Sequence, residues 1–484
     1  MRQPGTPTTG AQAGALSLCA VVTEVEAGRP GGPAQPAGLW SPDRRRLTTG
    51  LVLSVTLVAF EALAIATVLP VVSRHLGDLG LYGWVFSAFL LASLVGIVVA
   101  GTLADRVALP GPMLAGLALF AAGLLIGGLA PDMVVLVAGR AVQGLGAGVV
   151  PATAYVAISR GYPEPLRPRM FAVLSTAWVV PGLVGPVIAA AIATAFGWRW
   201  VFLALLPLVV ATGALSAAAL ASVPPPAGGG DTPRARLQAL PVGGVVAGAA
   251  GLLVSLGSGS VLAVPGGVVS AAVLALSLRR LTPKGTLLAR PGLPATVLSR
   301  GLLTFGFFAG DAYVPYAVTA ARHAPTLLGG VVLTGSTLTW AVGSWAQAHT
   351  IARTGARALV RTGEVLVACG LGTMAAVLLP GAPVYLAVAA WAVAGLGIGL
   401  AYSPLSVTTL AIALPGQEGR ATSALQLTDT LGQALGTGAA GAAVALARPG
   451  LGTGGAVALA FAAGALAIGV GLAAGTNVPG ATPA

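Results

Sequence analysis

Four ionisable residues lie inside long apolar runs of the sequence. Glu61, Asp311 and Asp429 are acids, and Arg140 is the only base that we expect deep inside such a run. An ionised carboxylate surrounded by hydrocarbon is costly, so each acid must take up a proton or find a partner. Arginine keeps its charge, so Arg140 must face the protein interior and find a partner there. These residues predict proton coupling, and a purely structural hydrogen bond or ion pair is the alternative for each.

The composition indicates which solvent surrounds these residues. The chain has 484 residues, of which 56% are hydrophobic and only 8% are charged. Soluble domains carry about 25% charged residues, so lipid must cover most of this surface. The formal net charge is +12, but the arginines sit in short clusters between apolar runs. That pattern favours the orientation of membrane loops and argues against nucleic-acid binding.

The apolar runs predict an all-α membrane protein with fourteen transmembrane helices. We expect two pseudo-symmetric six-helix bundles with an inserted helical hairpin between them. The run 241–278 is too long for one crossing, and Gly257 to Ser260 interrupts it, so it is read as the hairpin. The expected spans are 47–72, 83–104, 112–130, 133–158, 171–196, 200–222, the hairpin, 295–320, 327–349, 360–380, 383–412, 422–446 and 454–475.

These spans divide the chain into five parts. Residues 1–46 read as a disordered cytoplasmic tail, because they are rich in Pro, Gly, Ala and Thr without an apolar period. Residues 47–222 form the N-terminal bundle, 223–294 the linker and hairpin, 295–475 the C-terminal bundle and 476–484 a short tail.

The distribution of basic residues supports this topology. With a cytoplasmic N-terminus, most basic residues fall on the inner side, among them Arg106, Lys284, Arg300 and Arg420, whereas Arg74, Arg199, Arg322 and Arg448 fall outside. Positive charge is enriched in cytoplasmic loops, so both termini are expected inside.

The sequence also contains an internal repeat. The glycine-rich segment 144–148 recurs at 395–399, an offset of 251 residues, and the same offset relates Gly185 to Gly436. It also brings Glu61 to within one residue of Asp311. Parallel halves around a central site are typical of transporters.

Several motifs now support a family resemblance. Residues 101–106 end in Asp105 and Arg106 and match a cytoplasmic loop signature of the major facilitator superfamily, although Ala108, Leu109 and Pro110 depart from it. Residues 140–148 match the signature of its fourth helix. Residues 47–475 as a whole resemble the 14-helix drug:proton antiporters of that superfamily.

Two further motifs point to the antiporters within this superfamily. Gly185-Pro186 resembles the antiporter signature of the fifth helix, although Ala189 and Ala190 replace its last two glycines. Glu61 lies nine residues before Pro70, at a position where the family's helix-1 motif has an aspartate.

The resemblance implies roles for these residues. Glu61, Arg140, Asp311 and Asp429 are expected to couple protons, with Glu61 carrying most of the coupling and Asp311 contributing to substrate binding. Asp105 and Arg106 would lock an inner gate, and Gly185-Pro186 would bend the fifth helix. Aromatic residues could line the cavity of a flat or cationic substrate: Trp178, Tyr313, Trp340, Trp391 and Tyr402.

The expected function is therefore proton-driven export of lipophilic or amphipathic small molecules. The partners would be a small-molecule substrate, protons and the lipid bilayer of the inner membrane, and we expect a monomer. The sequence lacks a nucleotide-binding loop, a metal-ligand cluster and a convincing catalytic triad, so no cofactor besides a proton gradient is expected. A proton-coupled importer on the same fold is one alternative, and a membrane enzyme or sensor is another.

Overall fold

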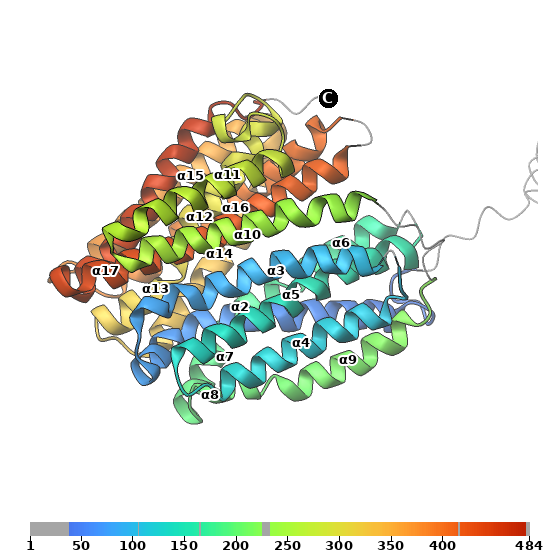
Figure 1. Cartoon of the computed structure of the whole chain (residues 1–484), viewed down its shortest axis with the longest axis horizontal. Coiled ribbons are helices and arrows are strands. Elements are labelled where there is room, and N and C mark those ends of the chain that lie inside the picture. The colour runs from blue at the N-terminus through green and yellow to red at the C-terminus, as the bar shows by residue number, and fades with distance from the viewer. Residues whose placement is uncertain (1–37, 105, 164–165, 225–232, 415–416, 481–484) are drawn as a thin grey trace, which may run out of the picture.

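The computed structural model describes residues 38–104, 106–163, 166–224, 233–414 and 417–480, and every regular element in them is helical (Figure 1). The predicted N-terminal tail therefore lies almost wholly outside the described residues, as does much of the predicted linker. Two helical bundles lie one above the other in Figure 1, the first coloured blue to green and the second yellow to red.

The first bundle follows the predicted spans closely, but two of those spans are interrupted. The helix predicted at 171–196 is divided at Ala177–Trp178, and the one at 200–222 is divided at Ala204–Leu205. Its helices are α2 (Arg45–Leu76), α3 (Tyr82–Ala104), α4 (Pro110–Gly128), α5 (Met133–Gly161), α6 (Arg167–Thr176), α7 (Val179–Ala195), α8 (Arg199–Leu203) and α9 (Leu206–Leu220).

The second bundle also matches its predicted spans, with one break and one merger. The span predicted at 295–320 is interrupted at Ala312–Tyr313. Its helices are α12 (Leu293–Asp311), α13 (Val314–Tyr316), α14 (Thr326–Thr354), α15 (Ala356–Val377), α16 (Leu386–Ile412) and α17 (Glu418–Gly475).

Helix α17 combines two predicted spans. Its 58 residues would measure about 87 Å as one straight helix, far more than the hydrocarbon core of about 30 Å. Gly452 has non-helical backbone angles, with φ of 66° and ψ of 179°, three residues after Pro449. The chain therefore turns at this point. In the described part of the chain, twelve helices are long and apolar enough to cross a membrane, with α17 counted once.

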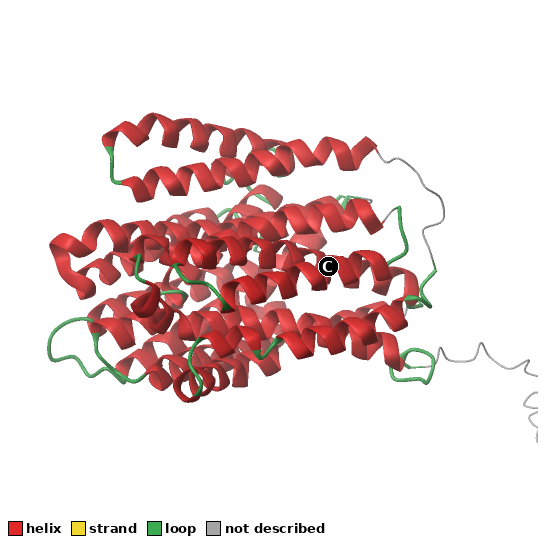
Figure 2. Cartoon of the chain, turned by 60° about the horizontal axis from the view of Figure 1, so that its bottom comes forward, coloured by secondary structure: helices red, strands yellow, loops and turns green. Residues whose placement is uncertain are grey.

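Helices α10 (Pro233–Ser258) and α11 (Val264–Leu281) follow the first bundle and precede the second in the sequence. They pack against each other. Gly259, with φ of +62°, begins the turn that joins them. Figure 2 shows the pair along one edge of the molecule. On α10, Val245 and Ala249 are buried in one apolar cluster with Leu94 of α3 and Ala434 of α17. Helix α10 therefore contacts both bundles.

The repeated glycines allow helix backbones to touch in the first bundle. A Cβ atom on Gly144 would lie 2.2 Å from the carbonyl oxygen of Phe89, and one on Gly148 would lie 2.1 Å from that of Ser93. Both carbonyls belong to α3, so α5 is pressed against α3 at these positions. Such close approach drives association where lipid removes the hydrophobic effect between helices.

The second bundle repeats this contact. A Cβ atom on Gly395 would lie 2.2 Å from the carbonyl oxygen of Ser336, and one on Gly399 would lie 2.3 Å from that of Trp340. The two halves therefore use equivalent glycines of α5 and α16 against equivalent neighbours, α3 and α14. In contrast, the pair related by the same offset, Gly185 and Gly436, differs: a Cβ atom on Gly436 would lie 2.3 Å from the Phe305 oxygen, whereas one on Gly185 meets Phe60 only at 3.6 Å.

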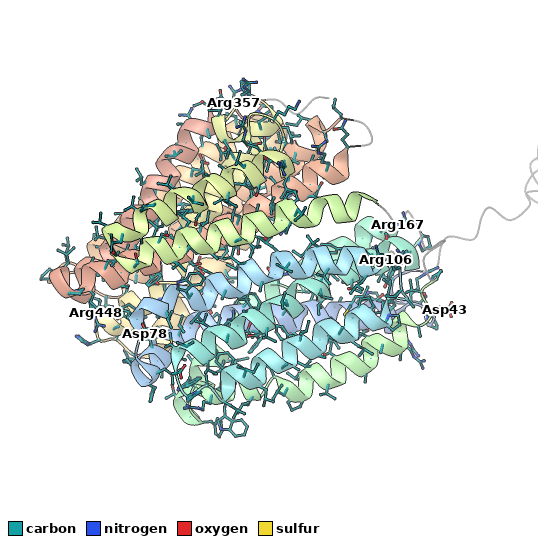
Figure 3. All side chains as sticks on the ribbon, in the orientation of Figure 1. Asp43, Asp78, Arg106, Arg167, Arg357 and Arg448 are labelled. Atoms are coloured by element: carbon teal, nitrogen blue, oxygen red, sulfur yellow. The ribbon has the colours of Figure 1, made fainter. Side chains whose placement is uncertain are left out.

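Basic residues gather at one end of the first bundle, where Arg45 and Arg46 begin α2 and Arg160 lies in the last turn of α5. Asp43, Arg106 and Arg167 lie together at one end of the first bundle, which we call the basic end, and Asp78 and Arg448 lie at the opposite end (Figure 3). The bundles converge at the opposite end and diverge toward the basic end (Figure 1). Arg300, which the topology counted among the basic loop residues, is wrongly assigned there: it lies inside α12 and is only 3% exposed.

The glycine contacts predict a contrast between two alanine variants. Gly148→Ala should lower the free energy of unfolding by about 1–3 kcal/mol, because its methyl group overlaps a backbone carbonyl of α3. Gly185→Ala should be neutral or slightly stabilising, since the site has room and alanine favours the helix. Thermal unfolding in detergent micelles checks both, and equal melting temperatures for the two variants would contradict the contact described here.

The charge distribution predicts which end faces the cytoplasm. Lys284 and His323 are both exposed and follow helices that run in opposite directions. In a background of Cys19→Ser and Cys369→Ser, an impermeant thiol reagent added outside intact cells should label His323→Cys and spare Lys284→Cys. Permeabilised cells supply the control, in which both positions should react. Labelling of Lys284→Cys alone from outside would show that the protein has the opposite orientation in the membrane.

Candidate functional site

An ion pair lies at the centre of the first bundle. Arg140 Nη1 of α5 donates to Glu61 Oε1 of α2, and the two side chains are 1% and 3% exposed. The sequence required a partner for Arg140 and either a proton or a partner for Glu61, and the structure makes each the partner of the other. Burial of this kind requires compensation, because a lone charge in a low-dielectric interior is strongly unfavourable.

Neutral groups complete the surroundings of Arg140. Its Nε donates to the backbone oxygen of Val85 at 3.0 Å, and its Nη1 also donates to Gln143 Oε1 at 2.7 Å. The guanidinium carbon lies 4.1 Å from the centre of the Phe89 ring. Arg140 is therefore held even apart from Glu61. In contrast, Glu61 Oε2 is buried without a hydrogen-bond partner among the described residues, which leaves one carboxylate oxygen able to accept a proton.

The second bundle has a different arrangement at the equivalent place. Trp391 of α16 donates from Nε1 to Asp311 Oδ1 at 2.8 Å. The repeat offset relates Trp391 to Arg140, and Asp311 lies within one residue of the position equivalent to Glu61. The structure thus repeats an acid of the first helix paired with a donor of the fourth helix, but in this half the donor is neutral.

A second buried ion pair was missed by the sequence analysis. Arg300 Nε of α12 donates to Asp429 Oδ1 of α17 at 2.8 Å, and both side chains are almost fully buried. Arg300 also donates to the backbone oxygen of Tyr402 and stacks on its ring. The Tyr402 hydroxyl donates to Asp429 Oδ2 at 3.1 Å. Apolar sequence resumes at Leu293, two helical turns before Arg300, and that signal could have identified the residue as intramembrane.

Aromatic side chains connect the two acids of the second bundle. Phe307 stacks on Trp391, with ring centres 5.2 Å apart, and meets Trp340 edge to face at 5.6 Å. Trp340 in turn meets Tyr402 edge to face at 5.4 Å. We call these four residues the aromatic row; it extends from the partner of Asp311 to the partner of Asp429. Three of them were predicted cavity residues, and Phe307 was missed.

The other two predicted cavity aromatics lie elsewhere. Tyr313 is fully buried at the opposite end of the molecule, where its ring contacts those of Tyr82 and Tyr316 at centre distances of 4.8 and 6.5 Å. Tyr82 belongs to the first bundle, and its hydroxyl donates to the backbone oxygen of Ala312. These tyrosines therefore join the two bundles. Trp178 lies at the start of α7, and 47% of its surface is exposed.

Further contacts close the opposite end. The Ser87 hydroxyl of α3 donates to the backbone oxygen of Ala434 at 2.8 Å, and Thr334 of α14 donates to the backbone oxygen of Leu183. A Cβ atom on Gly330 would lie 3.0 Å from the Pro186 oxygen. Helix α7 continues through Gly185 and Pro186 to Ala195, and the chain is interrupted before it at Ala177–Trp178. The bend at Gly185-Pro186 stays a prediction.

The predicted inner gate is only partly described. Asp105 lies outside the described residues. Arg106 is exposed at the basic end, directly after α3. Next to it, Arg160 of α5 donates to the backbone oxygen of Ala104 at 3.0 Å. A cation at a helix C-terminus is favourable, so Arg160 stabilises the end of α3 that carries the loop signature.

One buried acid was not predicted at all. Glu364 of α15 is 0% exposed, and neither of its carboxylate oxygens has a hydrogen-bond partner in the described part of the chain. It packs against Gly471 and Gly475 of α17. Within the described residues, no group of three His, Cys, Asp or Glu side chains could hold a metal ion.

The first ion pair predicts a large stability effect. Arg140→Met should lower the free energy of unfolding by about 3–5 kcal/mol, because it leaves the Glu61 carboxylate buried without compensation. The double variant Glu61→Gln/Arg140→Met removes both charges and should recover much of that loss. Denaturant unfolding in detergent measures this, with exposed Arg353→Gln as the control. A double variant no more stable than Arg140→Met would show that the ion pair between Glu61 and Arg140 does not contribute to the free energy of unfolding.

Comparisons with known proteins agree on the class of protein. Residues 51–437 match the family model of the Major Facilitator Superfamily. The chain is 29% identical over 417 residues to a probable multidrug-efflux transporter of Mycobacterium tuberculosis, covering 82% of this chain and 87% of that protein. A multidrug transporter protein of Bacillus subtilis is 29% identical over 165 residues, which cover 34% of this chain and 30% of that protein.

A solved structure shares the fold. A D-xylose-proton symporter aligns with a TM-score of 0.65 at 14% identity, covering 90% of this chain and 98% of that one. This likeness concerns the fold alone. The family model, in contrast, covers most of the chain. We conclude that the chain is a multi-pass membrane transporter of the Major Facilitator Superfamily and not an enzyme.

Proposed function

We propose that this transporter exports lipophilic or amphipathic small molecules across the inner membrane in exchange for protons. The observation that carries the proposal is the buried carboxylate of Glu61, which pairs with Arg140 through one oxygen and leaves the other without a partner. The multidrug-efflux relatives, at modest identity, support the substrate class.

Glu61 would act as the proton carrier. Its ionised form is stabilised by Arg140, and a proton on the free Oε2 would neutralise the carboxylate and weaken the pair. Arg140 would keep its bonds to Val85 of α3 and to Gln143 of its own helix, so its guanidinium would still be held when Glu61 is neutral. A substrate that needs the Glu61 charge and a proton that removes it then exclude one another, which is the physical basis of antiport.

The second bundle would supply the substrate surface. The aromatic row offers flat, polarisable faces, and Trp340 and Tyr402 are partly exposed. Such rings suit planar or cationic compounds. Asp311 at one end of the row would contribute to substrate binding, while Asp429 is engaged by Arg300 at the other end and would be a secondary proton site.

The proposal includes a topology and a gate. Fourteen crossings result if α7 crosses the membrane and α17 crosses twice, in addition to the other long apolar helices, with α10 and α11 as the inserted hairpin. The basic end, with both termini, would face the cytoplasm. The contacts among Tyr82, Tyr313 and Tyr316 would then close the outer side, and Asp105 and Arg106 would close the inner side in the alternate state.

An importer on the same fold is the main rival. The D-xylose-proton symporter demonstrates that this fold is compatible with symport, so direction must come from the site. A row of four aromatic rings favours an apolar ligand over a sugar, because a sugar requires many hydrogen-bonding groups.

The coupling proposal predicts the behaviour of one variant. Glu61→Gln keeps the shape of the side chain and mimics its protonated form, so it should abolish gradient-driven export while substrate still binds and exchanges. Reconstituted vesicles with an imposed pH gradient and a fluorescent lipophilic cation measure this. Asp132→Asn is the matched control, because this exposed acid caps α5 and asparagine preserves the cap.

Three outcomes distinguish the proton carrier, a residue outside the mechanism and an importer. Loss of uphill transport with retained exchange supports Glu61 as the proton carrier. Full gradient-driven accumulation by Glu61→Gln would remove this residue from the mechanism. Accumulation in the direction of proton flow by the unmodified protein would identify an importer.

A further inference from the structure

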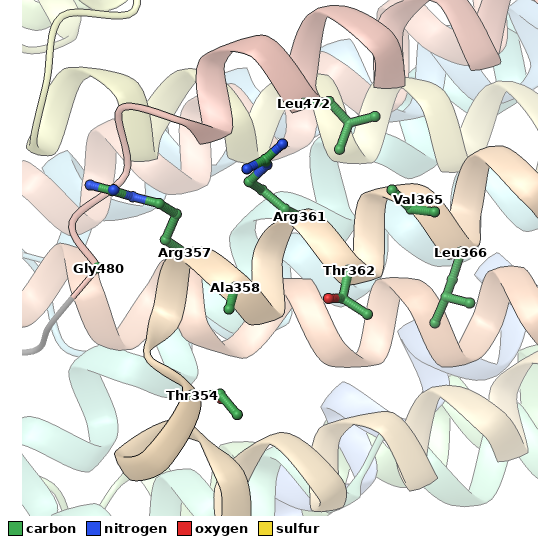
Figure 4. A pocket seen from close by; sticks show the side chains of 9 residues that line it. All are labelled: Thr354, Arg357, Ala358, Arg361, Thr362, Val365, Leu366, Leu472 and Gly480. Carbon is green, nitrogen blue, oxygen red and sulfur yellow. The ribbon is translucent and has the colours of Figure 1, made fainter.

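A cavity outside the proposed transport path lies in the second bundle, at the end that corresponds to the basic end of the first bundle. Its volume is about 560 Å³, and it is bordered by α15 and the final residues of α17 (Figure 4). The side chains that line it are of two kinds: cationic and polar ones, Thr354, Arg357, Arg361 and Thr362, and apolar ones, Ala358, Val365, Leu366 and Leu472.

The two kinds are arranged in order along the helix. Arg357, Arg361 and Val365 are spaced by four residues, so they lie on one face of α15. The arginines occupy the first turns, near the basic end, and Val365 and Leu366 follow further along the helix. Leu472 of α17 faces them across the cavity (Figure 4). The cavity is therefore cationic where the membrane surface would be and apolar where acyl chains would be.

The backbone holds the cationic part in place. Arg357 Nε donates to the backbone oxygen of Val478 at 2.7 Å, which leaves its terminal nitrogens available. A Cβ atom on Gly355 would lie 2.1 Å from the Gly480 oxygen, so the chain after α17 packs tightly against the turn before α15. This contact fixes the base of the cavity.

Arg361 is the less engaged of the two arginines. It is exposed, and it forms no hydrogen bond or ion pair among the described residues. Glu364 lies one turn further along α15, but its carboxylate is buried against α17 and does not line the cavity. The Glu364 carboxylate attracts the Arg361 guanidinium electrostatically without a hydrogen bond, so the donors of the guanidinium stay unused among the described residues. Such a guanidinium beside an apolar groove is suited to a phosphate group.

We propose that this cavity binds an anionic glycerophospholipid from the leaflet that borders the basic end. The phosphate would lie between Arg357 and Arg361, and one acyl chain would follow Val365 toward Leu472. The commitment to a lipid rests on the order of the lining: a free phosphate would use the arginines alone, whereas only an amphipathic anion uses the apolar part too.

Native mass spectrometry of the full chain in detergent tests the proposal. Phosphatidylglycerol should bind more tightly than phosphatidylcholine of the same acyl length. The double variant Arg357→Gln/Arg361→Gln should weaken phosphatidylglycerol binding by about 30-fold, as expected for two basic residues near a membrane surface. Arg357→Lys/Arg361→Lys keeps both charges and should restore most of the affinity.

Matched variants separate this site from general surface charge. Arg279→Gln/Arg280→Gln removes two exposed arginines at the end of α11, outside the cavity, and should leave binding unchanged. Arg361→Gln alone disturbs no hydrogen bond and should still weaken binding, which guards against misfolding of the double variant. Val365→Glu introduces a charge into the apolar part and should also weaken binding.

The remaining outcomes overturn the proposal. An equal loss of phosphatidylglycerol affinity in Arg279→Gln/Arg280→Gln would mean that the lipid is attracted to the basic surface in general and not to this cavity. Equal affinity for both lipids would mean an apolar groove without headgroup recognition. Complete displacement of phosphatidylglycerol by inorganic phosphate at a similar concentration, with no effect of Val365→Glu, would mean a simple anion site.

Discussion

The cost of burying charge in a helical bundle surrounded by lipid governs the interior of this transporter. Arg140 and Arg300 cannot lose their protons, so each brings an acid, a backbone carbonyl oxygen and one further side-chain oxygen to its side. This requirement joins α2 to α5 in one half and α12 to α17 in the other. Because each pair is buried, loss of either partner would leave an uncompensated charge in place.

Close backbone packing makes these pairs possible. The glycines of α5 contact α3, and Arg140 projects from the same helix one turn before them. In the second bundle, α16 approaches α14 in the same way and carries Trp391 at the equivalent position. The small residues thus set the spacing of the helices, and the spacing lets a side chain of the fourth helix in each half reach an acid of the first helix.

The two halves share a framework but differ in charge. The first half pairs an acid with a base, whereas Asp311 of the second half accepts a hydrogen bond from the indole of Trp391. A carboxylate beside a full positive charge and one beside a neutral donor respond differently to protonation. The aromatic row is likewise confined to the second half. This asymmetry would allow one half to handle protons and the other to bind an apolar ligand.

The sequence by itself determined the membrane environment, the approximate ranges of most membrane-spanning helices and the four ionisable residues Glu61, Arg140, Asp311 and Asp429 inside them, because apolar runs and isolated charges are local features. Their partners were decided by tertiary structure. Asp429 pairs with Arg300, 129 residues away, and Tyr313 joins the bundle interface and not the aromatic row. Helix rotation and packing set which side chains meet, and neither is encoded in the spacing along one helix. Glu364 was overlooked although it lies inside the span predicted at 360–380, and the packing of α15 against α17 buries it.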